Sequence, residues 1–239
     1  AQGQIMAPQF ILSISTSSGV AKVACVTKPV LNALAPPIAF SFEIVDYKSQ
    51  SALLLPTMRQ HLNAANLEPE QCAAIAVDVG PGGFTSLRTA CGVAQGLSTA
   101  WNVPTVPLSS FECMLSKMDT ESPVTVLMDA RLNEVYMATL SRTHQGTVWI
   151  QQPCLLGVSE LHTVREGHVI ADSFTANLLA AHNRVVQVGD VSAVQLALLA
   201  WQELEAGRVS EPFDCQPQYV RDKVAQTTSE RMAAKHGVV

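Results

Sequence analysis

The sequence predicts an α/β protein made of two similar halves, each with a mixed β-sheet. Short apolar segments alternate with helical patterns along the chain, which is typical of sheets flanked by helices. Each half opens with segments expected to be antiparallel strands and then alternates helix and strand. The chain has 239 residues, of which 48% are apolar and 15% charged, so it is long enough for one large or two small folded units.

The first half begins with three predicted strands and a helix. Phe10–Ile14 and Val20–Val26 are apolar runs joined by a turn rich in Ser, Thr and Gly, which predicts a β-hairpin. Ala39–Val45 is expected to add a third strand. Ser51–Asn66 carries apolar residues at helical spacing, and Pro56 is tolerated only in a first turn, so the helix is expected to begin there.

A strand, a glycine loop and a helix follow. The apolar run Ala73–Val79 predicts the strand, and Phe84–Ala100 predicts the helix, which Pro104 prevents from continuing. A short strand is expected at Thr105–Leu108, after which Ser109 or Ser110 is placed to cap a helix beginning at Phe111.

The second half repeats this alternation. Its expected strands are Val124–Asp129, Val135–Leu140, Thr147–Ile150 and His168–Ala171. Ser159 is expected to open a short helix, and a longer helix, capped by Asp190 and stopped by Gly207, should follow. We expect a first lobe over 8–112, a second over 113–225 with helix 190–207 packed back on the first, and a tail over 226–239.

The glycine loop, GPGGFTSLR at 80–88, permits two interpretations. Its glycines would let backbone N–H groups approach a phosphate at a helix N-terminus. However, no lysine follows them as in a P-loop, and the GxGxxG pattern lacks its last glycine. A tight corner with Thr85 or Ser86 as cap is the simpler interpretation, and phosphate binding stays open.

The helix after this loop has unusually small side chains. Gly92 and Gly96 lie four residues apart, and glycine inside a helix costs about 0.8–1 kcal/mol relative to alanine. Something is therefore expected to pack closely on this face. Periodicity alone does not distinguish a neighbouring element of this chain from a helix of a partner.

Composition excludes several classes of protein. The formal net charge is −5, and no basic face for nucleic acid is visible. No apolar run approaches the ~20 residues that span a membrane. No Lys or Arg precedes Lys22, which argues against a signal peptide. The six cysteines include no CxxC pair, so we expect free thiols in a cytoplasmic protein.

Five motifs resemble those of one family. The stretch GPGGFTSLRTACGVAQGLS resembles the pattern GPGSFTGLRxGxxxAxGLA, and MDARLNEVYMATL resembles IDARMxEVYxA. ILSISTSS, SALLLP and PQYVRDKVA are similar to ILAIDTS, HSxxLLP and PxYLRxxVA. The motifs agree in order and together cover residues 10 to 225. On these residues the chain is identified as a member of the TsaB (YeaZ) family of bacterial tRNA threonylcarbamoyladenosine biosynthesis subunits.

The resemblance implies two ribonuclease-H-like lobes of the actin-like ATPase (ASKHA) fold, with the second lobe degenerate. It implies an accessory, non-catalytic subunit that helps to place threonylcarbamoyl on adenosine 37 of tRNA. The implied partners are TsaD, which performs the transfer, and the ATPase TsaE, with TsaC supplying the activated intermediate. A homodimer in isolation is also implied, and tRNA would be reached only through the complex.

The resemblance also assigns residues. The glycine loop comprises Gly80, Gly82, Gly83, Thr85 and Arg88. The partner surface falls on the two first-lobe helices, at Met58, Leu62, Leu87, Cys91, Gly92, Gln95 and Gly96. The remaining family motifs contribute Asp129, Arg131, Glu134, Tyr136, Tyr219 and Arg221. No catalytic or metal-binding residue is assigned.

Departures from the family pattern weaken an independent nucleotide site. Ser15 stands where the family has the aspartate that actin-like ATPases use near metal and phosphate, and a serine does not supply that charge. Gln50 replaces the family histidine. We therefore expect no cofactor on the chain alone, with ATP and Mg²⁺ at most in a complex with TsaD and TsaE. A small actin-like kinase and a homodimeric interaction module without a tRNA role are the alternatives.

Two further clusters have simpler interpretations. His162 and His168 surround Glu166, but their spacing is not that of HExxH, so a metalloprotease site is not expected. Asp129, Arg131 and Glu134 lie around a hairpin turn, where a polar catalytic cluster is one interpretation. The simpler interpretation, which we favour, is that Asp129 and Arg131 pair and hold the turn.

Overall fold

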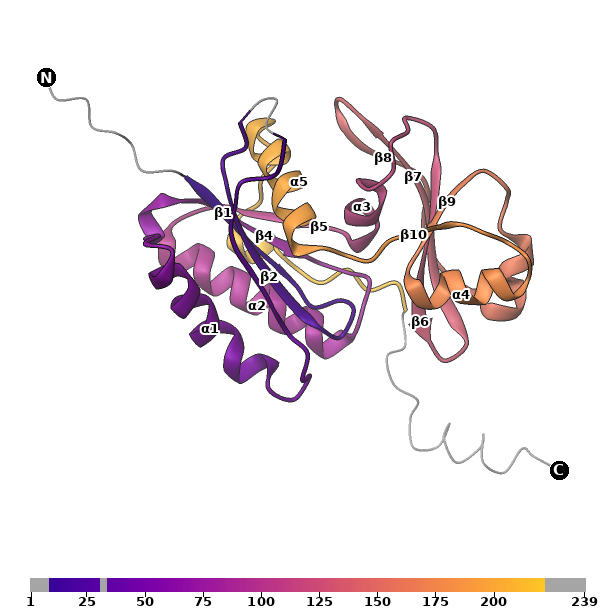
Figure 1. Cartoon of the computed structure of the whole chain (residues 1–239), viewed down its shortest axis with the longest axis horizontal. Helices are drawn as coiled ribbons and strands as arrows, with labels where there is room; N and C mark the ends of the chain where they lie inside the picture. Colours follow the sequence, from indigo (N-terminus) through magenta and orange to yellow (C-terminus); the bar gives the residue numbers. More distant parts are fainter. Residues whose placement is uncertain (1–8, 31–33, 222–239) are drawn as a thin grey trace, which may run out of the picture.

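A computed structural model of the chain describes residues 9–30 and 34–221, which form two five-stranded sheets side by side (Figure 1). The first sheet contains β1 (Phe10–Ser15), β2 (Ala21–Thr27), β3 (Ile38–Ile44), β4 (Cys72–Asp78) and β5 (Thr105–Leu108). The second contains β6 (Val124–Arg131), β7 (Glu134–Thr143), β8 (Gly146–Gly157), β9 (His168–Ala171) and β10 (Gln187–Val188). The tail expected over 226–239, and residues 222–225 of the expected second lobe, lie outside the described residues.

The two sheets have the same topology. The first runs β3-β2-β1-β4-β5, with β1–β2–β3 antiparallel and β4 and β5 parallel to β1. The second runs β8-β7-β6-β9-β10 with the same pattern of directions. The predicted class, two α/β lobes with mixed sheets flanked by helices, is therefore confirmed.

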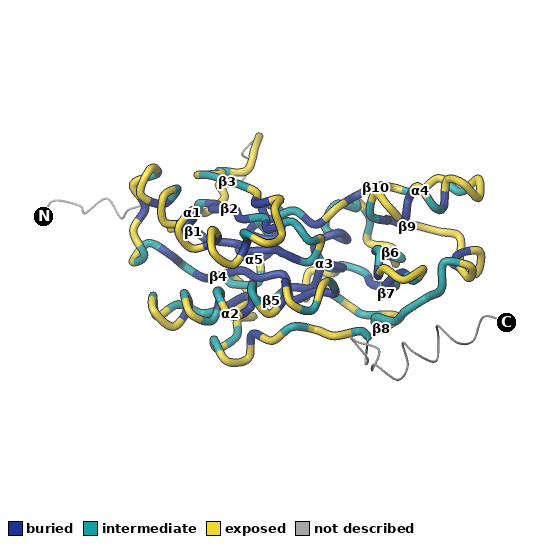
Figure 2. Tube along the Cα trace, turned by 90° about the horizontal axis from the view of Figure 1, so that it is seen from below, coloured by how far each residue is buried: buried dark blue, intermediate teal, exposed yellow. Residues whose placement is uncertain are grey.

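Helices form a layer between the two sheets and a layer on the outer face of each sheet (Figures 1 and 2). The helices are α1 (Gln50–Ala64), α2 (Phe84–Trp101), α3 (Ser110–Leu115), α4 (Ser173–Ala181) and α5 (Ala193–Glu205), with short 3-10 turns η1 (Pro69–Gln71), η2 (Val158–Thr163) and η3 (Pro212–Asp214). Helices α1 and α2 cover the outer face of the first sheet, while α3 and α5 lie between the sheets. Helix α4 and η2 cover the outer face of the second sheet.

Apolar side chains fill the space between these layers. The central cluster joins both lobes, because it contains residues of both sheets together with α3 and α5. Trp201 of α5 is buried there and donates its indole N–H to the Val26 carbonyl, 3.1 Å away. Ser13 donates to the Ala193 carbonyl at 2.6 Å. Helix α5 is thus fixed to the first sheet although it follows the second in sequence.

Helix boundaries correct three expectations. Helix α1 begins at Gln50 and contains Pro56, because Leu54 is already buried on the sheet and packing outweighs the hydrogen bond that proline cannot make. Gly83 occupies the N-cap of α2, so neither Thr85 nor Ser86 caps it. Ser192 caps α5, accepting from the Gln195 amide, in place of Asp190.

The second lobe differs from expectation in three elements. Strand β8 extends to Gly157, well beyond the expected end at Ile150. Helix α4 and the edge strand β10 were not expected at all. Asp172 caps α4 by accepting from the Thr175 amide at 2.7 Å. The second lobe therefore completes the same strand order as the first, with a shorter helix on its outer face.

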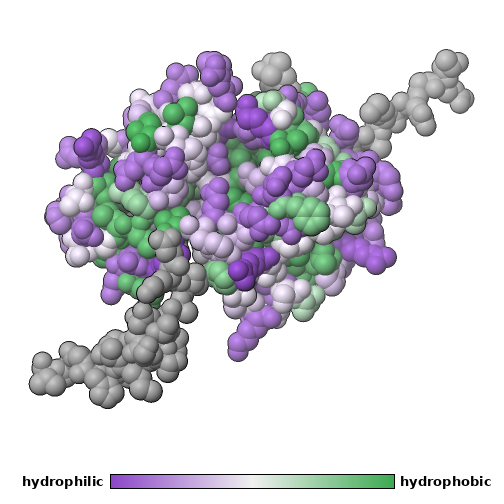
Figure 3. Space-filling model, turned by 180° about the vertical axis from the view of Figure 1, so that it is seen from behind, coloured by the Kyte–Doolittle hydropathy of each residue, from purple (hydrophilic) through white to green (hydrophobic). Residues whose placement is uncertain are grey.

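The surface is mixed in character. Seen from behind, hydrophobic residues gather in patches on both lobes, separated by hydrophilic ones (Figure 3). Within the part of the chain that the structure describes, no helix is long and apolar enough to cross a bilayer.

Candidate functional site: the interlobe cleft and the outer face of α2

A cleft of about 590 Å³ lies between the lobes. The first lobe contributes the β1–β2 turn and the glycine loop, and the second contributes the β6–β7 hairpin and the start of α4. The sequence-predicted Gly82, Gly83, Thr85, Asp129 and Arg131 all line it. The fold therefore brings the glycine loop and the hairpin motif together from segments more than forty residues apart.

Two of the loop glycines, Gly80 and Gly82, are required by backbone conformation and by the close approach of neighbouring residues. Gly80 has φ +106°, and a Cβ added there would lie 2.7 Å from the Leu87 side chain. A Cβ on Gly82 would lie 2.7 Å from both the Cα and the carbonyl oxygen of Ser17. Such contacts leave no room for a larger residue. The loop is a tight corner packed on the β1–β2 turn, with Gly83 in place of Thr85 or Ser86 at the N-cap of α2.

A buried carboxylate lies beneath this corner. Asp78, at the end of β4, is fully buried and accepts from Ser15 Oγ at 2.8 Å, Ser110 Oγ at 2.7 Å and the Gly80 amide at 2.9 Å. Burial raises the pKa of Asp78, and hydrogen bonds from the surrounding hydroxyls and the Gly80 amide oppose that rise. The serine that replaces the family aspartate is thus paired with a carboxylate from another strand.

The second lobe has a corresponding pair at the same point of its topology. Asp129, near the end of β6, donates its backbone N–H to Asp172 Oδ2, 2.6 Å away, just after β9. Asp129 also forms an ion pair with Arg131 at 3.1 Å, as the sequence predicted. Both carboxylates line the cleft, unlike Asp78, which is enclosed.

A C-terminal segment, residues 208–221, joins the two lobes, and we call it the strap. Ser210 pairs with Thr105 beside β5, and the Gln218 amide donates to the Val79 carbonyl at 2.8 Å. At the end of the strap, Arg221 donates to Glu134 and to the Ala130 carbonyl in the second lobe.

The strap also completes an aromatic cluster at the start of α2. Tyr219 stacks on Phe84 with ring centroids 5.1 Å apart, and its hydroxyl accepts from Arg88 Nε at 3.0 Å. The Arg88 guanidinium lies 4.0 Å from the centre of the Phe84 ring. Tyr136 lines a small cavity of about 160 Å³ beneath this cluster, together with strap residues. The C-terminal motif residues Tyr219 and Arg221 thus contact the start of α2 after the glycine loop and the β6–β7 hairpin at one place.

The outer face of α2 carries an exposed row that we call the α2 stripe: Arg88, Gly92, Gly96 and Thr99. Added Cβ atoms at Gly92 and Gly96 would meet nothing within 4 Å. No described part of this chain therefore packs against these glycines, so close packing within the chain does not explain them.

Four residues expected on the partner surface lie elsewhere. Met58, Leu62, Leu87 and Cys91 are at most 7% exposed and belong to the first-lobe interior. Their side chains are buried inside the first lobe, so they do not form part of the exposed face of these helices. Gln95 is half-buried and donates to the Cys215 carbonyl of the strap at 2.7 Å. Leu53 and Leu55 of α1, 47% and 45% exposed, were not singled out from the sequence.

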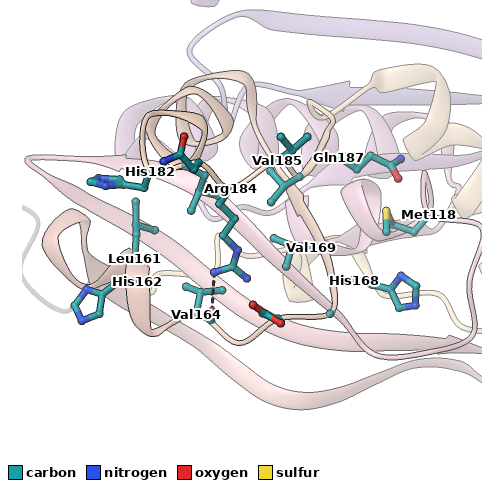
Figure 4. Close-up of a pocket in the computed structure, with 15 residues that line it drawn as sticks. Met118, Leu161, His162, Val164, His168, Val169, His182, Arg184, Val185 and Gln187 are labelled. Atoms are coloured by element: carbon teal, nitrogen blue, oxygen red, sulfur yellow. Dashed lines mark hydrogen bonds between the residues drawn. The ribbon is translucent and has the colours of Figure 1, made fainter.

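A larger cavity, about 840 Å³, lies on the outer side of the second lobe (Figure 4). His162 and His168 line it at opposite ends, and Arg184 donates to the carbonyls of Val164 and Arg165 at 2.6 Å. The described residues contain no group of three or more His, Cys, Asp or Glu side chains placed to hold a metal ion. This cavity contains no glycine-loop or hairpin-motif residue.

Sequence reasoning missed Asp78 and Asp172. Asp78 is the single charged residue in an otherwise apolar strand that ends at the glycine loop, a signal that could have identified it. Asp172 precedes a helix and is a standard capping residue, but α4 itself was not foreseen.

Comparison with known proteins relates these features to a family. A family model described as "TsaD: tRNA N6-adenosine threonylcarbamoyltransferase" matches residues 46–233. The tRNA threonylcarbamoyladenosine biosynthesis protein TsaB of Haemophilus influenzae is 32% identical over 98 residues, which cover 40% of this chain and 42% of that protein. TsaB of Escherichia coli is 28% identical over 142 residues, covering 58% of each chain. The matched segments thus span about half the length of these curated relatives.

Solved structures agree with the fold. A Pseudomonas aeruginosa protein described as similar to peptidase YEAZ superposes with a TM-score of 0.70 at 22% identity, covering 89% of this chain and all of that one. YeaZ from the same organism gives a TM-score of 0.68 at 22% identity, covering 88% and 99%. Since the family model matches most of the sequence, the chain belongs to the TsaD family of tRNA N6-adenosine threonylcarbamoyltransferases and, within it, is similar to the proteins named TsaB and YeaZ.

Proposed function

We propose that the chain is a non-catalytic subunit of the machinery that makes threonylcarbamoyladenosine at position 37 of tRNA. In this role it pairs with the transferase TsaD through the α2 stripe, TsaE joins the pair, and TsaC supplies the activated threonylcarbamoyl group. The protein acts in the cytoplasm and reaches tRNA only through this complex. The names of its curated relatives support the pathway.

The open glycines of α2 are the observation that carries the partner proposal. Helix axes approach one another most closely where the side chains at the contact are small. Gly92 and Gly96 weaken the helix without serving any contact of the described chain. A partner's helix packed on the stripe uses that space, and the exposed Leu53 and Leu55 of α1 supply apolar area on the same outer layer.

The enclosed Asp78 supports an accessory role. A metal-bound nucleotide would need a carboxylate oxygen free to face the cleft. Both oxygens of Asp78 are already engaged, one by Ser15 and the other by Ser110 and the Gly80 amide. The carboxylates that line the cleft are engaged as well, Asp129 by Arg131 and Asp172 by the Asp129 and Thr175 amides. We infer that the cleft of this chain alone holds ATP weakly, and that ATP and Mg²⁺ act at the assembled complex.

An in vitro modification assay tests the proposed role. Adenosine modification of tRNA by TsaC, TsaD and TsaE is measured by mass spectrometry with and without the protein. Modification is expected only when the protein is present. Equal modification in its absence would overturn the subunit role. If TsaD still bound the chain in that case, the chain would be an interaction module.

A further inference from the structure

Two cysteines far apart in the sequence lie together beside the strap. Cys91 is on α2 and Cys215 is in the strap, and they are 2% and 0% exposed. Both residues belong to the same buried cluster of the first lobe, and their thiols lie close enough for each to shift the pKa of the other. One helical turn beyond Cys91, Gln95 fixes the Cys215 carbonyl at 2.7 Å. The two side chains are thus held against one another by contacts of the surrounding backbone.

This pair lies midway along the docked strap. On one side of Cys215, Ser210 bonds to Thr105 of β5. On the other side, the Gln218 amide donates to the carbonyl of Val79, just after β4. A covalent link at Cys215 would therefore hold both neighbouring contacts and, through Arg221, the connection to the second lobe.

The pair also differs chemically from the other buried cysteines. Burial raises the pKa values of Cys25, Cys72 and Cys113 to about 12, which suppresses their thiolates. The interaction with Cys91 lowers the pKa of Cys215, and the same interaction together with burial raises that of Cys91. Because Cys215 lies on the strap, lifting of the strap exposes this thiol to solvent, and we therefore assign it as the attacking sulfur.

We propose that Cys91 and Cys215 form a reversible disulfide that locks the strap onto α2 when a small-molecule disulfide such as glutathione disulfide is abundant. The inference rests on the pair and the strap alone and does not depend on the proposed tRNA role.

The reaction balances as two thiol–disulfide exchanges. When the strap lifts, the Cys215 thiolate attacks one sulfur of glutathione disulfide, forming a mixed disulfide and releasing one glutathione thiolate. On redocking, Cys91 loses its proton and attacks the Cys215 sulfur, releasing the second glutathione thiolate. The two protein thiols are oxidised by two electrons, and their protons end on the two glutathione molecules formed.

Disulfide mapping in glutathione buffers tests the proposal. The full chain is equilibrated over a range of glutathione to glutathione disulfide ratios, quenched in acid, alkylated and digested. The expected product is a Cys91–Cys215 linked peptide that returns to two thiols on reduction. A map showing only a mixed disulfide on the half-buried Cys154, or another pairing, would overturn it.

Hydrogen exchange tests the lock itself. In the oxidised protein the Gln218 amide should exchange about tenfold more slowly than in the reduced protein, because strap opening is restricted. Cys91→Ala and Cys215→Ser should both abolish this difference, whereas Cys154→Ser should retain it. If either variant fails to fold, the disulfide map and the exchange rates of the wild-type protein still test the proposal. An unchanged Gln218 exchange rate in oxidised protein that contains the Cys91–Cys215 disulfide refutes the lock.

Discussion

The two lobes share one strand order but differ in what covers them and in how their strand ends meet. In the first lobe, two long helices cover the outer face, and Ser15 and Asp78 meet in a buried, fully bonded pair. In the second, a short helix and a 3-10 turn cover the outer face, and Asp129 and Asp172 meet at the cleft. Strand order alone therefore does not make two equivalent sites, because polar groups at the strand ends can be enclosed or left open to the cleft.

Shortening one leucine in each outer layer tests whether the lobes unfold together. Leu54 of α1 and Leu179 of α4 are 0% and 1% exposed. Leu54→Ala and Leu179→Ala should each lower the free energy of unfolding by about 2–5 kcal/mol. Because the central cluster joins both lobes, urea unfolding followed by circular dichroism and tryptophan fluorescence should stay a single transition. Two separate transitions would mean that the lobes are independent.

Replacing Asp78 tests the enclosed pair of the first lobe. Asp78→Ala leaves the Ser15 and Ser110 hydroxyls and the Gly80 amide without their acceptor and should cost about 3 kcal/mol. Asp78→Asn keeps a side chain of nearly the same shape, with one oxygen that accepts and an amide group that donates. It should therefore lower the free energy of unfolding much less than Asp78→Ala does.

The pH dependence of these variants has a defined sign. Since the folded-state pKa of Asp78 is raised above 3.8, its contribution to stability is greatest at low pH and is lost as pH rises through the folded value. Asp78→Asn should remove that loss, so its stability relative to wild type should increase with pH above about 4 in urea titrations. A difference independent of pH would show that Asp78 does not titrate as inferred.

At the open pair of the second lobe, the smallest effects are expected. Asp172→Ala removes the acceptor for the Thr175 and Asp129 amides and should cost about 1–2 kcal/mol. Arg131→Ala breaks an ion pair whose arginine side chain is 78% exposed, and it should cost no more than about 0.5 kcal/mol. Thermal unfolding of both variants measures which one loses more stability. A larger loss for Arg131→Ala would show that the Asp129–Arg131 ion pair stabilises the β6–β7 hairpin more than the Asp172 hydrogen bonds do.

Much of the fold follows from local patterns. Strands β5 and β9 occupy the expected residues, and α2 ends within one residue of its expected end, because each is an apolar run bounded by Gly, Pro or a capping residue. Helix α4 escaped prediction because Ser173–Ala181 is apolar or small on most sides and shows no clear stripe.

The site was harder to predict because its partners are distant in sequence. Asp78 accepts hydrogen bonds from Ser15, 63 residues away in the sequence, and from Ser110, 32 residues away. No local sequence pattern predicts either bond. Likewise, only the fold shows that Cys91 faces inward while its neighbour Gly92 faces out. The order of the motifs indicates the family. The surface that a partner would contact can be identified only once the packing of α2 on the first sheet is known.

The α2 stripe is tested most directly by two substitutions of one glycine in the reconstituted tRNA modification assay. Gly92→Ala and Gly92→Leu both favour the helix by most of the ~1 kcal/mol that glycine costs, but only leucine fills the space above the stripe. If a partner helix packs on the stripe, Gly92→Ala should support modification like wild type. Gly92→Leu should remain folded yet weaken TsaD binding about tenfold to a hundredfold, with a matching loss of modification at limiting protein. Full TsaD binding and modification with folded Gly92→Leu would contradict this packing.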